Sequence, residues 1–186
     1  MRAIGIDPVA DTQKCFRTLV SAMSRPGTVH ETPTNPADHA VLATLVDHEV
    51  SCYTTDETIE TALANEGRLT EASMAEADIV HATTPTDGDV ETLRRGSLTE
   101  PSDGATIVYR VTELTPEPAA QPAATTLSLS GPGINDEQRL AVEGLPASEA
   151  ESIATAQSGY PQGVDAIVAT ETALAALPRS IELEVQ

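Results

Sequence analysis

The sequence predicts an α/β fold, a layered domain in which helices flank a mixed β-sheet. Expected strands alternate with expected helices from residue 36 to residue 185, the pattern of layered α/β domains. Near the end of the chain, an apolar run after Gly163 and an alternating tail at 181–185 predict two strands joined by a short turn. Such a hairpin pairs antiparallel, so we expect a mixed sheet.

The length and composition are consistent with one domain that has an unusual core. We expect residues 1–10 to be loosely ordered and residues 11–186 to form a single α/β domain. Leu, Ile, Val and Phe make up only about a fifth of the chain, near the compositional border with disorder. Apolar runs with helical and strand periods still favour a folded chain whose core is built from Ala, Val, Leu and Ile.

The charge of the chain is strongly acidic. It has 29 Asp and Glu against ten Lys and Arg, and Lys14 is the only lysine. Acid-rich, lysine-poor surfaces are typical of halophiles that accumulate salt, and we expect a halophilic archaeal source. At about 1 M salt the Debye length is about 3 Å, so the acidic self-repulsion is screened and folding is predicted to depend on salt. The charge argues against nucleic-acid binding, which needs basic patches.

The sequence predicts a cytoplasmic protein without a membrane segment. No stretch approaches about 18 apolar residues, and the first residues show no charged-then-apolar signal pattern. Cys15 and Cys52 lie outside any C-x-x-C pair and are expected as free thiols, since the cytosol is reducing.

The first expected element is an amphipathic helix that begins at Asp11-Thr12, which offers an N-cap. It should end near Arg25, because Pro26-Gly27 follows. Arg17 and Arg25 either lie on a solvated helix face or contact an anion or a partner. The residues expected to pack in the core follow at helical spacing: Phe16, Leu19, Val20 and Met23.

The later elements are predicted from caps, turn residues and apolar periods. Residues 115–124 hold three prolines and are expected to be a connection. The elements are a helix from Asn35-Pro36 to Leu45, a strand at 49–54, a helix from Asp56 to Gly67, a strand at Ile79-Val80, a helical turn at 87–93, a strand at 106–111, a strand at 125–130 and a helix from Ser148 to Ala156.

The motifs of several enzyme classes are absent from the sequence. There is no G-x-x-x-x-G-K phosphate loop and no G-x-S-x-G nucleophile elbow. No metal site is predicted, because the four histidines lack the spacing of a metal motif: His30, His39, His48 and His81. The motifs therefore assign no nucleophile, general base or metal ligand.

An anion site is the remaining chemical hypothesis. Gly131 and Gly133 bracket a turn that can aim backbone N–H groups at a phosphate or phosphonate oxygen. Arg25 and Arg179 can supply forked hydrogen bonds to the same dianion, and Asp165 can orient one of them. The alternative is that the glycines only permit a tight turn, that the arginines pair with some of the many carboxylates, and that Asp165 meets solvent.

Three segments, in this order, resemble PhnH, the H subunit of the bacterial and archaeal carbon–phosphorus lyase system. They are Phe16-Arg17-Thr18-Leu19-Val20-Ser21-Ala22-Met23-Ser24-Arg25-Pro26-Gly27, Gly131-Pro132-Gly133-Ile134, and Tyr160-Pro161-Gln162-Gly163-Val164-Asp165 with Leu177-Pro178-Arg179-Ser180. The resemblance implies a fold like the large domain of pyridoxal-phosphate-dependent transferases. We expect no cofactor, because a Schiff base needs a lysine and Lys14 precedes every strand.

The resemblance also implies a biological role. The H subunit acts with the G, I and L subunits in making ribose 1-alkylphosphonate 5-triphosphate from ATP and an alkylphosphonate, and G, H, I and J form one core assembly. We therefore expect a required subunit of this lyase and phosphonate triphosphate synthase complex, one that organises its partners. The resemblance implies docking on the I subunit and a homodimer when the chain is alone.

Two alternatives stay open. The chain is an enzyme or binding subunit with its own phosphonate or nucleotide site around Arg25, Gly131 and Arg179, completed at a homodimer interface. Otherwise it is a paralogue that kept the fold and lost the system. One departure concerns this site: Ser180-Ile181 stands where many family members have two threonines, which puts a role for hydroxyls beside Arg179 in doubt, although Ser180 keeps one.

Overall fold

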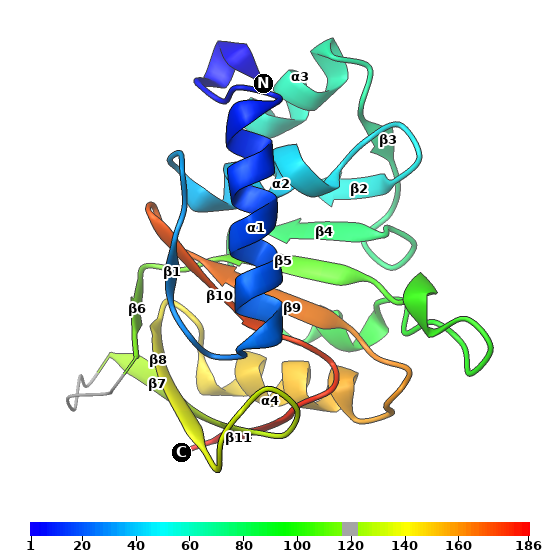
Figure 1. The fold of residues 1–186 in the computed structure, drawn as a ribbon. Coiled ribbons are helices and arrows are strands. Elements are labelled where there is room, and N and C mark those ends of the chain that lie inside the picture. The colour runs from blue at the N-terminus through cyan, green and yellow to red at the C-terminus, as the bar shows by residue number, and fades with distance from the viewer. Residues whose placement is uncertain (117–122) are drawn as a thin grey trace.

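Two β-sheets and four α-helices make up the fold of residues 1–116 and 123–186, the part of the chain that the computed structural model describes (Figure 1). The central sheet has seven strands in the order β1-β10-β9-β5-β4-β2-β3, and a second sheet has four in the order β11-β7-β8-β6. The strands are β1 His30–Glu31, β2 Ser51–Thr54, β3 Thr70–Glu71, β4 Ile79–Ala82, β5 Thr106–Arg110, β6 Glu113–Thr115, β7 Ala124–Ser130, β8 Gln138–Glu143, β9 Asp165–Ala169, β10 Ala173–Leu177 and β11 Glu182–Val185.

The central sheet is mixed, as the sequence predicted. Strands β9, β5, β4, β2 and β3 run parallel to one another, whereas β10 pairs antiparallel with β9 and β1 pairs antiparallel with β10. In the parallel part, Ile107 of β5 lies opposite Val80 of β4 and Ala166 of β9. The α/β fold class is therefore confirmed. The predicted hairpin was wrong in its second strand, because β9 pairs antiparallel with β10 and the tail at 181–185 lies in the other sheet.

Helices cover one face of the central sheet, and the second sheet lies against the other. The first face carries α1 Ala10–Ser24, α2 Ala37–Leu45 and α3 Glu57–Asn65, and Figure 1 shows α1 crossing in front of the strands. On the second face, α4 Ala147–Gln157 and the second sheet share one core with the strands. Side chains alternate between the two faces: Val108 packs under the helices, and Ile107 and Tyr109 face the second sheet.

Short 3-10 helices complete the fold: η1 Arg2–Ile4, η2 Asp89–Thr92 and η3 Pro101–Asp103. Residues 1–10 contain the first of them and bury the side chains of Met1 and Ile6 against α2 and α3. The N-terminal ammonium group also forms an ion pair with Glu66. How well ordered this segment is in solution stays a prediction.

The end of the chain differs from the prediction. The sequence suggested two strands, but the structure has three, because the chain leaves the central sheet at Pro178 and β11 pairs with β7. Arg179 therefore lies in the connection between the two sheets, before β11 begins. Strand β8 was not expected at all: half of it is polar or charged, and its partners come from β7 and β6 rather than from a local pattern.

The buried face of α1 also differs from the prediction. Leu19 is buried as expected, but Phe16 and Val20 are 55% and 52% exposed, so their assignment to the core was wrong. The buried residues beside Leu19 are Cys15 and Ala22, which pack on the alanine-rich α2 and on β10. Small side chains fit this close contact between helix and sheet, and they turn the larger residues outward.

The sequence predicted side-chain N-caps for α1 and α3, and the structure confirms one of them. Asp56 caps α3 as predicted, since its carboxylate accepts the N–H groups of Thr58 and Ile59 at 2.9 and 3.4 Å. At α1 the predicted N-cap at Asp11-Thr12 was wrong, because the helix begins before it. Asp7 accepts the N–H groups of Val9 and Ala10 at 2.9 and 2.7 Å, and the helix begins at Ala10.

Two other sequence expectations concern thiols and membranes. Cys15 and Cys52 are free and buried, and burial raises the pKa of the Cys52 thiol to about 12. No helix in residues 1–116 and 123–186 is long and apolar enough to cross a membrane. The predicted connection at 115–124 lies mostly outside the described residues.

Candidate functional site

Three segments that are distant in the sequence meet at the C-terminal end of α1. A β-carbon on Gly133 would lie 2.6 Å from the carbonyl oxygen of Ser24, and one on Gly131 would lie 3.3 Å from the Cα of Ile181. The turn between β7 and β8 therefore touches both α1 and the chain after β10. We call this place the motif junction, formed by residues 24–27, 131–134 and 178–181.

Within the motif junction, hydrogen bonds hold the side chain of Arg179 in place. Its Nε and Nη2 donate to one oxygen of Asp165 at 3.0 and 2.5 Å, and its backbone N–H donates to the other at 2.8 Å. Its Nη1 donates to the Pro101 carbonyl at 2.6 Å, and Nη2 also donates to the Gly104 carbonyl at 3.3 Å. All three guanidinium nitrogens thus have protein acceptors.

The Arg179 guanidinium also packs closely against Gly104. A β-carbon on Gly104 would lie 2.2 Å from Arg179 Nη1, so only glycine leaves room for the guanidinium there. The side chain of Arg179 is 13% exposed and that of Asp165 is 17% exposed. This pair joins β9, the chain after β10 and the loop before β5.

Arg25 lies at the same junction in a different environment. Its side chain is exposed and makes no hydrogen bond or ion pair with any other described residue. Burial, and then the nearby charge of Arg25, lowers the pKa of His30. The structure therefore brings Arg25 close to the Gly131–Gly133 turn, pairs Asp165 with Arg179, and directs the Arg179 guanidinium toward the loop at 101–104.

A second polar group lies where three parallel strands end. His81 is in β4, Arg110 is the last residue of β5, and Asp56 follows β2. Asp38 and His39 come from the first turn of α2, which packs over these strand ends. We call this group the strand-end cluster: Asp38, His39, Asp56, His81 and Arg110.

The members of the strand-end cluster bond to one another. Asp38 Oδ2 accepts from Arg110 Nε at 2.6 Å and is hydrogen-bonded to His81 Nε2 at 2.9 Å. Arg110 Nη2 donates to Asp56 Oδ2 at 2.6 Å, and His39 Nε2 lies 3.0 Å from the same oxygen. Arg110 thus links two carboxylates that belong to different elements.

These contacts lower the pKa of both carboxylates, Asp38 and Asp56. Burial alone would raise the pKa of Asp38, but the hydrogen bonds and charges of His81 and Arg110 hold it below its ordinary value. Burial also acts against ionisation of Asp56, and hydrogen bonds from Arg110 and His39 hold its pKa well below the ordinary value. Both groups are therefore ionised near neutral pH.

His81 and Asp38 form the buried part of the strand-end cluster. His81 bonds to Thr54 Oγ1 through Nδ1 at 2.9 Å and to Asp38 through Nε2, so its ring has no free nitrogen. The side chains of His81 and Asp38 are 0% and 1% exposed. Arg110 is 36% exposed, Asp56 12% and His39 8%, and two carboxylates balance the charge of Arg110. The arrangement stabilises the strand ends.

A small pocket opens beside this cluster, at the ends of β2 and β4. After β2 the chain passes to α3 on one face of the sheet, and after β4 it passes to η2, which packs on α4 on the other face. Ligands of open α/β sheets bind where neighbouring connections diverge in this way. The pocket has a volume of about 180 Å³ and is lined by Tyr53, Thr55, Met74, Val80, His81, Ala82, Thr83, Thr84, Pro85, Thr86 and Asp89.

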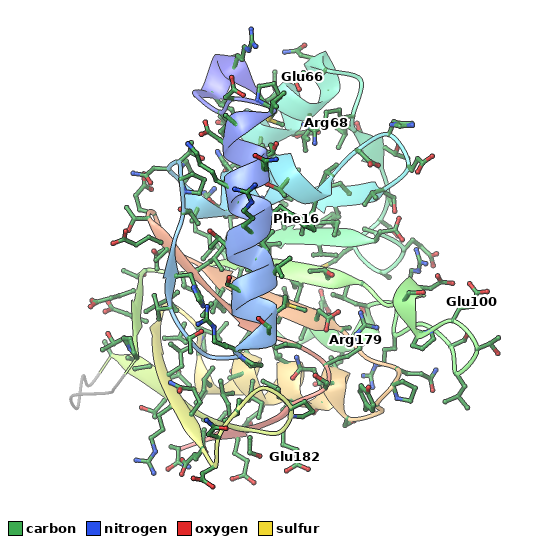
Figure 2. All side chains as sticks on the ribbon, in the orientation of Figure 1. Phe16, Glu66, Arg68, Glu100, Arg179 and Glu182 are labelled. Atoms are coloured by element: carbon green, nitrogen blue, oxygen red, sulfur yellow. The ribbon has the colours of Figure 1, made fainter. Side chains whose placement is uncertain are left out.

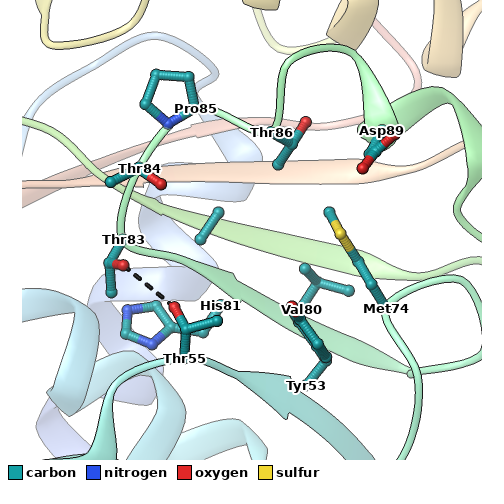
Figure 3. A pocket seen from close by; sticks show the side chains of 11 residues that line it. Tyr53, Thr55, Met74, Val80, His81, Thr83, Thr84, Pro85, Thr86 and Asp89 are labelled. Atoms are coloured by element: carbon teal, nitrogen blue, oxygen red, sulfur yellow. Dashed lines mark hydrogen bonds between the residues drawn. The ribbon is translucent and has the colours of Figure 1, made fainter.

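The lining of this pocket does not suit a phosphonate dianion or a nucleotide. Figure 3 shows residues 83–86 arching around one side, with Met74 and Tyr53 on the other, and Thr55 and Thr83 joined by a hydroxyl contact of 3.3 Å. No Lys or Arg lines it, and Asp89 adds a negative charge. Its volume lies below the roughly 300 Å³ at which pockets for drug-sized ligands begin.

A buried carboxylate fixes the loop that shapes this pocket. Glu149 of α4 accepts from Tyr109 Oη at 2.6 Å, from Thr86 through its N–H at 3.0 Å and its hydroxyl at 2.5 Å, and from the Gly88 N–H at 3.3 Å. Burial works against ionisation, but these donors lower the pKa of Glu149. Burial, and then Glu149, raises the pKa of Tyr109 well above its ordinary range. Glu149 is therefore a structural anchor.

The motifs did not predict the strand-end cluster or the pocket. The available signal was the polar residues that follow two expected strands, at 54–56 and 83–86. Because the carboxyl ends of parallel strands share one edge of a sheet, these segments meet there. Among residues 1–116 and 123–186, no three or more His, Cys, Asp or Glu side chains are placed to hold a metal ion.

Comparison with known proteins shows to which family the chain belongs. Residues 5–184 match the family model described as bacterial phosphonate metabolism protein (PhnH). The chain is also 34% identical over 182 residues to HtxG of Stutzerimonas stutzeri, described as a candidate C–P lyase subunit; the match covers 94% of this chain and 86% of that protein. The family match takes in the motif junction and the strand-end cluster. The chain therefore belongs to the PhnH family of phosphonate metabolism proteins.

Proposed function

We propose that this chain is a subunit of a carbon–phosphorus lyase complex, where it organises partner subunits and carries out no chemistry of its own. Family membership and the relative described as a candidate C–P lyase subunit support the pathway. The proposed role is to support formation of ribose 1-alkylphosphonate 5-triphosphate from ATP and an alkylphosphonate. The proposed partners are the G, I and J subunits, with L acting in the same reaction in the cytoplasm.

The observation that carries the organising role is that the guanidinium nitrogens of Arg179 already bond to acceptors within the fold. An arginine that binds a substrate dianion needs free N–H groups and an unbalanced charge. The nitrogens of Arg179 bond to Asp165 and to two carbonyl oxygens, and the pair lies inside the fold. The strand-end cluster is satisfied in the same internal way. The polar groups described above therefore support the fold.

Co-purification tests this proposal. The chain carries an affinity tag, is expressed with candidate G, I and J subunits and is captured in about 2 M KCl, where acidic self-repulsion is screened. We expect a stable complex by light scattering in the same buffer. Reconstituted triphosphate formation should require the chain. A chain that captures none of these subunits would contradict the proposal.

The alternative function is a phosphonate- or nucleotide-binding subunit, and Arg25 is the observation that favours it. Arg25 is exposed, has no partner among the described residues and lies beside the Gly131–Gly133 turn. In this proposal Arg25 and the turn bind the anion, Asp165 and Arg179 position the loop, and a second copy of the chain completes the site. Calorimetry with methylphosphonate or ATP distinguishes the two functions. If the chain is a binding subunit, the wild type should bind one of these ligands and Arg25→Ala should abolish that binding.

A further inference from the structure

The outer face of α1 carries an exposed apolar stripe. Phe16 is 55% exposed and Val20 is 52% exposed, and Val9, at the start of the helix, is 74% exposed. Their spacing places them along one side of α1. Phe16 projects outward from α1 midway along it (Figure 2). A groove of about 400 Å³ borders the stripe and is lined by Pro8, Val9, Thr12, Gln13, Phe16 and Thr44.

The position of Phe16 is informative because of the composition of the chain. Phe16 is its only phenylalanine, and there is no tryptophan. A core built mainly from Ala, Val, Leu and Ile would gain from a large ring, yet the ring lies outside the core. Aromatic side chains kept on a surface are enriched at the centres of protein interfaces.

The first 30 residues, which contain the stripe, carry a charge opposite to that of the rest of the chain. Residues 1–30 hold four basic and two acidic side chains, and the rest of the chain holds six basic and 27 acidic ones. Arg2, Arg17 and Arg25 are exposed and make no side-chain hydrogen bond or ion pair with the described residues. All six arginines of the later part bond to carboxylates or carbonyl oxygens: Arg68, Arg94, Arg95, Arg110, Arg139 and Arg179.

We infer that this face of α1, which we call the α1 face (Val9, Phe16, Arg17 and Val20), is a docking surface for another protein subunit. The partner surface would have an apolar pocket for Phe16 bordered by carboxylates that pair with Arg17. The inference rests on the proposed function, which supplies the subunits among which the partner is sought.

Charge complementarity argues against a second copy of the chain as this partner. In a two-fold symmetric dimer through the α1 face, the basic side chains of both copies would share one interface. Pairing this face with the acidic surface elsewhere on another copy would be head-to-tail and would favour open chains. A different subunit with an acidic rim satisfies both the apolar and the charged part of the face.

Binding measurements with paired variants test the inference. Phe16→Ala is compared with Tyr160→Ala and Leu98→Ala, because Tyr160 and Leu98 are also exposed, at 70% and 75%, but lie elsewhere. We expect Phe16→Ala to weaken binding to the captured subunit by at least about 30-fold, as for a central interface residue. The two control variants should bind within about threefold of the wild type. Thermal unfolding in the same buffer shows that each variant is folded.

A second pair of variants tests the charge. Arg17→Glu should weaken binding about tenfold or more at the lowest KCl concentration that keeps the chain folded, and less at about 2 M, where screening is strong. Arg139→Glu, on β8 and 54% exposed, is the matched control and should have little effect.

The outcomes separate the inference from the proposed function. If the wild type binds a subunit and Phe16→Ala binds equally well, the α1 face is not the docking surface and the proposed function stands. If Phe16→Ala instead disrupts a homodimer while subunit binding is unchanged, a second copy occupies the face and the inferred partner is wrong. A wild type that binds no subunit contradicts the proposed function and the inferred partner together.

Discussion

The Arg179–Asp165 pair shows how two side chains can join distant segments. One carboxylate orders the guanidinium and the backbone N–H of Arg179, and the guanidinium then bonds to carbonyl oxygens about 75 residues earlier in the chain. Both side chains are mostly buried, so removing one leaves the other without a partner or full hydration. The stability of the motif junction should therefore depend on this pair.

We predict that Arg179→Ala lowers the free energy of unfolding by about 2–4 kcal/mol, because it leaves the Asp165 carboxylate unpaired. Urea denaturation in high salt measures this loss. Arg139→Ala removes an exposed ion pair and should change stability by less than about 1 kcal/mol. Equal effects of the two variants would show that the junction does not depend on Arg179.

The strand-end cluster predicts a pH dependence with a definite sign. The pKa of Asp38 is lower in the folded chain than its ordinary value of 3.8, because His81 and Arg110 outweigh the effect of burial. A carboxyl whose pKa is lowered by folding contributes stability above its unfolded pKa and loses it as pH falls through the folded pKa. This contribution should be complete near neutral pH and decrease below about pH 4.

The comparison of wild type with Asp38→Asn isolates this effect, since acid also relieves the general repulsion of the acidic surface. We expect the difference in unfolding free energy between them to shrink as pH falls from about 6 to about 3. Chemical denaturation at high salt measures it, because salt screens the surface charges far more than the buried pair. A difference that is constant with pH would mean that Asp38 is not ionised against Arg110.

At the scale of elements, the turn between β7 and β8 is held against the end of α1. Gly133 has a φ of +85°, and a β-carbon on it would lie 2.6 Å from the backbone of Ser24. Gly67, after α3, has a φ of +66° but open space around it. The positive φ favours glycine at both positions, but only at Gly133 would a β-carbon also collide with a neighbouring segment.

We predict that Gly67→Ala lowers the unfolding free energy by about 1 kcal/mol through backbone strain. Gly133→Ala should cost about 1–3 kcal/mol more, because α1 and the turn must move apart. Thermal unfolding of the two variants in one buffer measures the difference. Similar losses would mean that the turn does not press on α1.

At the scale of the whole molecule, the acidic charge acts on a core of small side chains. The net charge is −19, and burying Ala and Val yields less stabilisation per residue than burying large aromatic groups. Unscreened repulsion is therefore large relative to the marginal stability of a domain.

We predict that the melting temperature rises substantially between about 0.1 M and about 2 M KCl, because screening reduces the repulsion among carboxylates. Differential scanning calorimetry measures both values. Potassium sulfate at equal ionic strength controls for the general salting-out effect on apolar groups. Equal stability at the two KCl concentrations would rule out salt-dependent folding.

Much of this structure was determined locally and could be predicted. The cap at Asp56, the apolar run of β9 and the turn at Gly131–Gly133 each follow from neighbours in the sequence, because caps, strand periods and positive φ angles are local properties. The α/β class followed from the order of such elements. The segment of Arg25 contacts Gly133, and Asp165 pairs with Arg179, but an anion site formed by these residues stays a prediction.

Only the tertiary structure decided which partner each exposed or buried group meets. The alternating tail at 182–185 fits any half-exposed sheet edge, and pairing with β7 placed it in the second sheet. Helical spacing allowed either Phe16 or Cys15 to face the core, and the close contact with the alanines of α2 selected Cys15. The sequence suggested that Asp165 orients Arg25 or Arg179, but it did not show which one, and it did not show the carbonyl partners of Arg179 at 101–104. Local patterns determine that an element forms, whereas its contacts depend on distant residues that folding brings together.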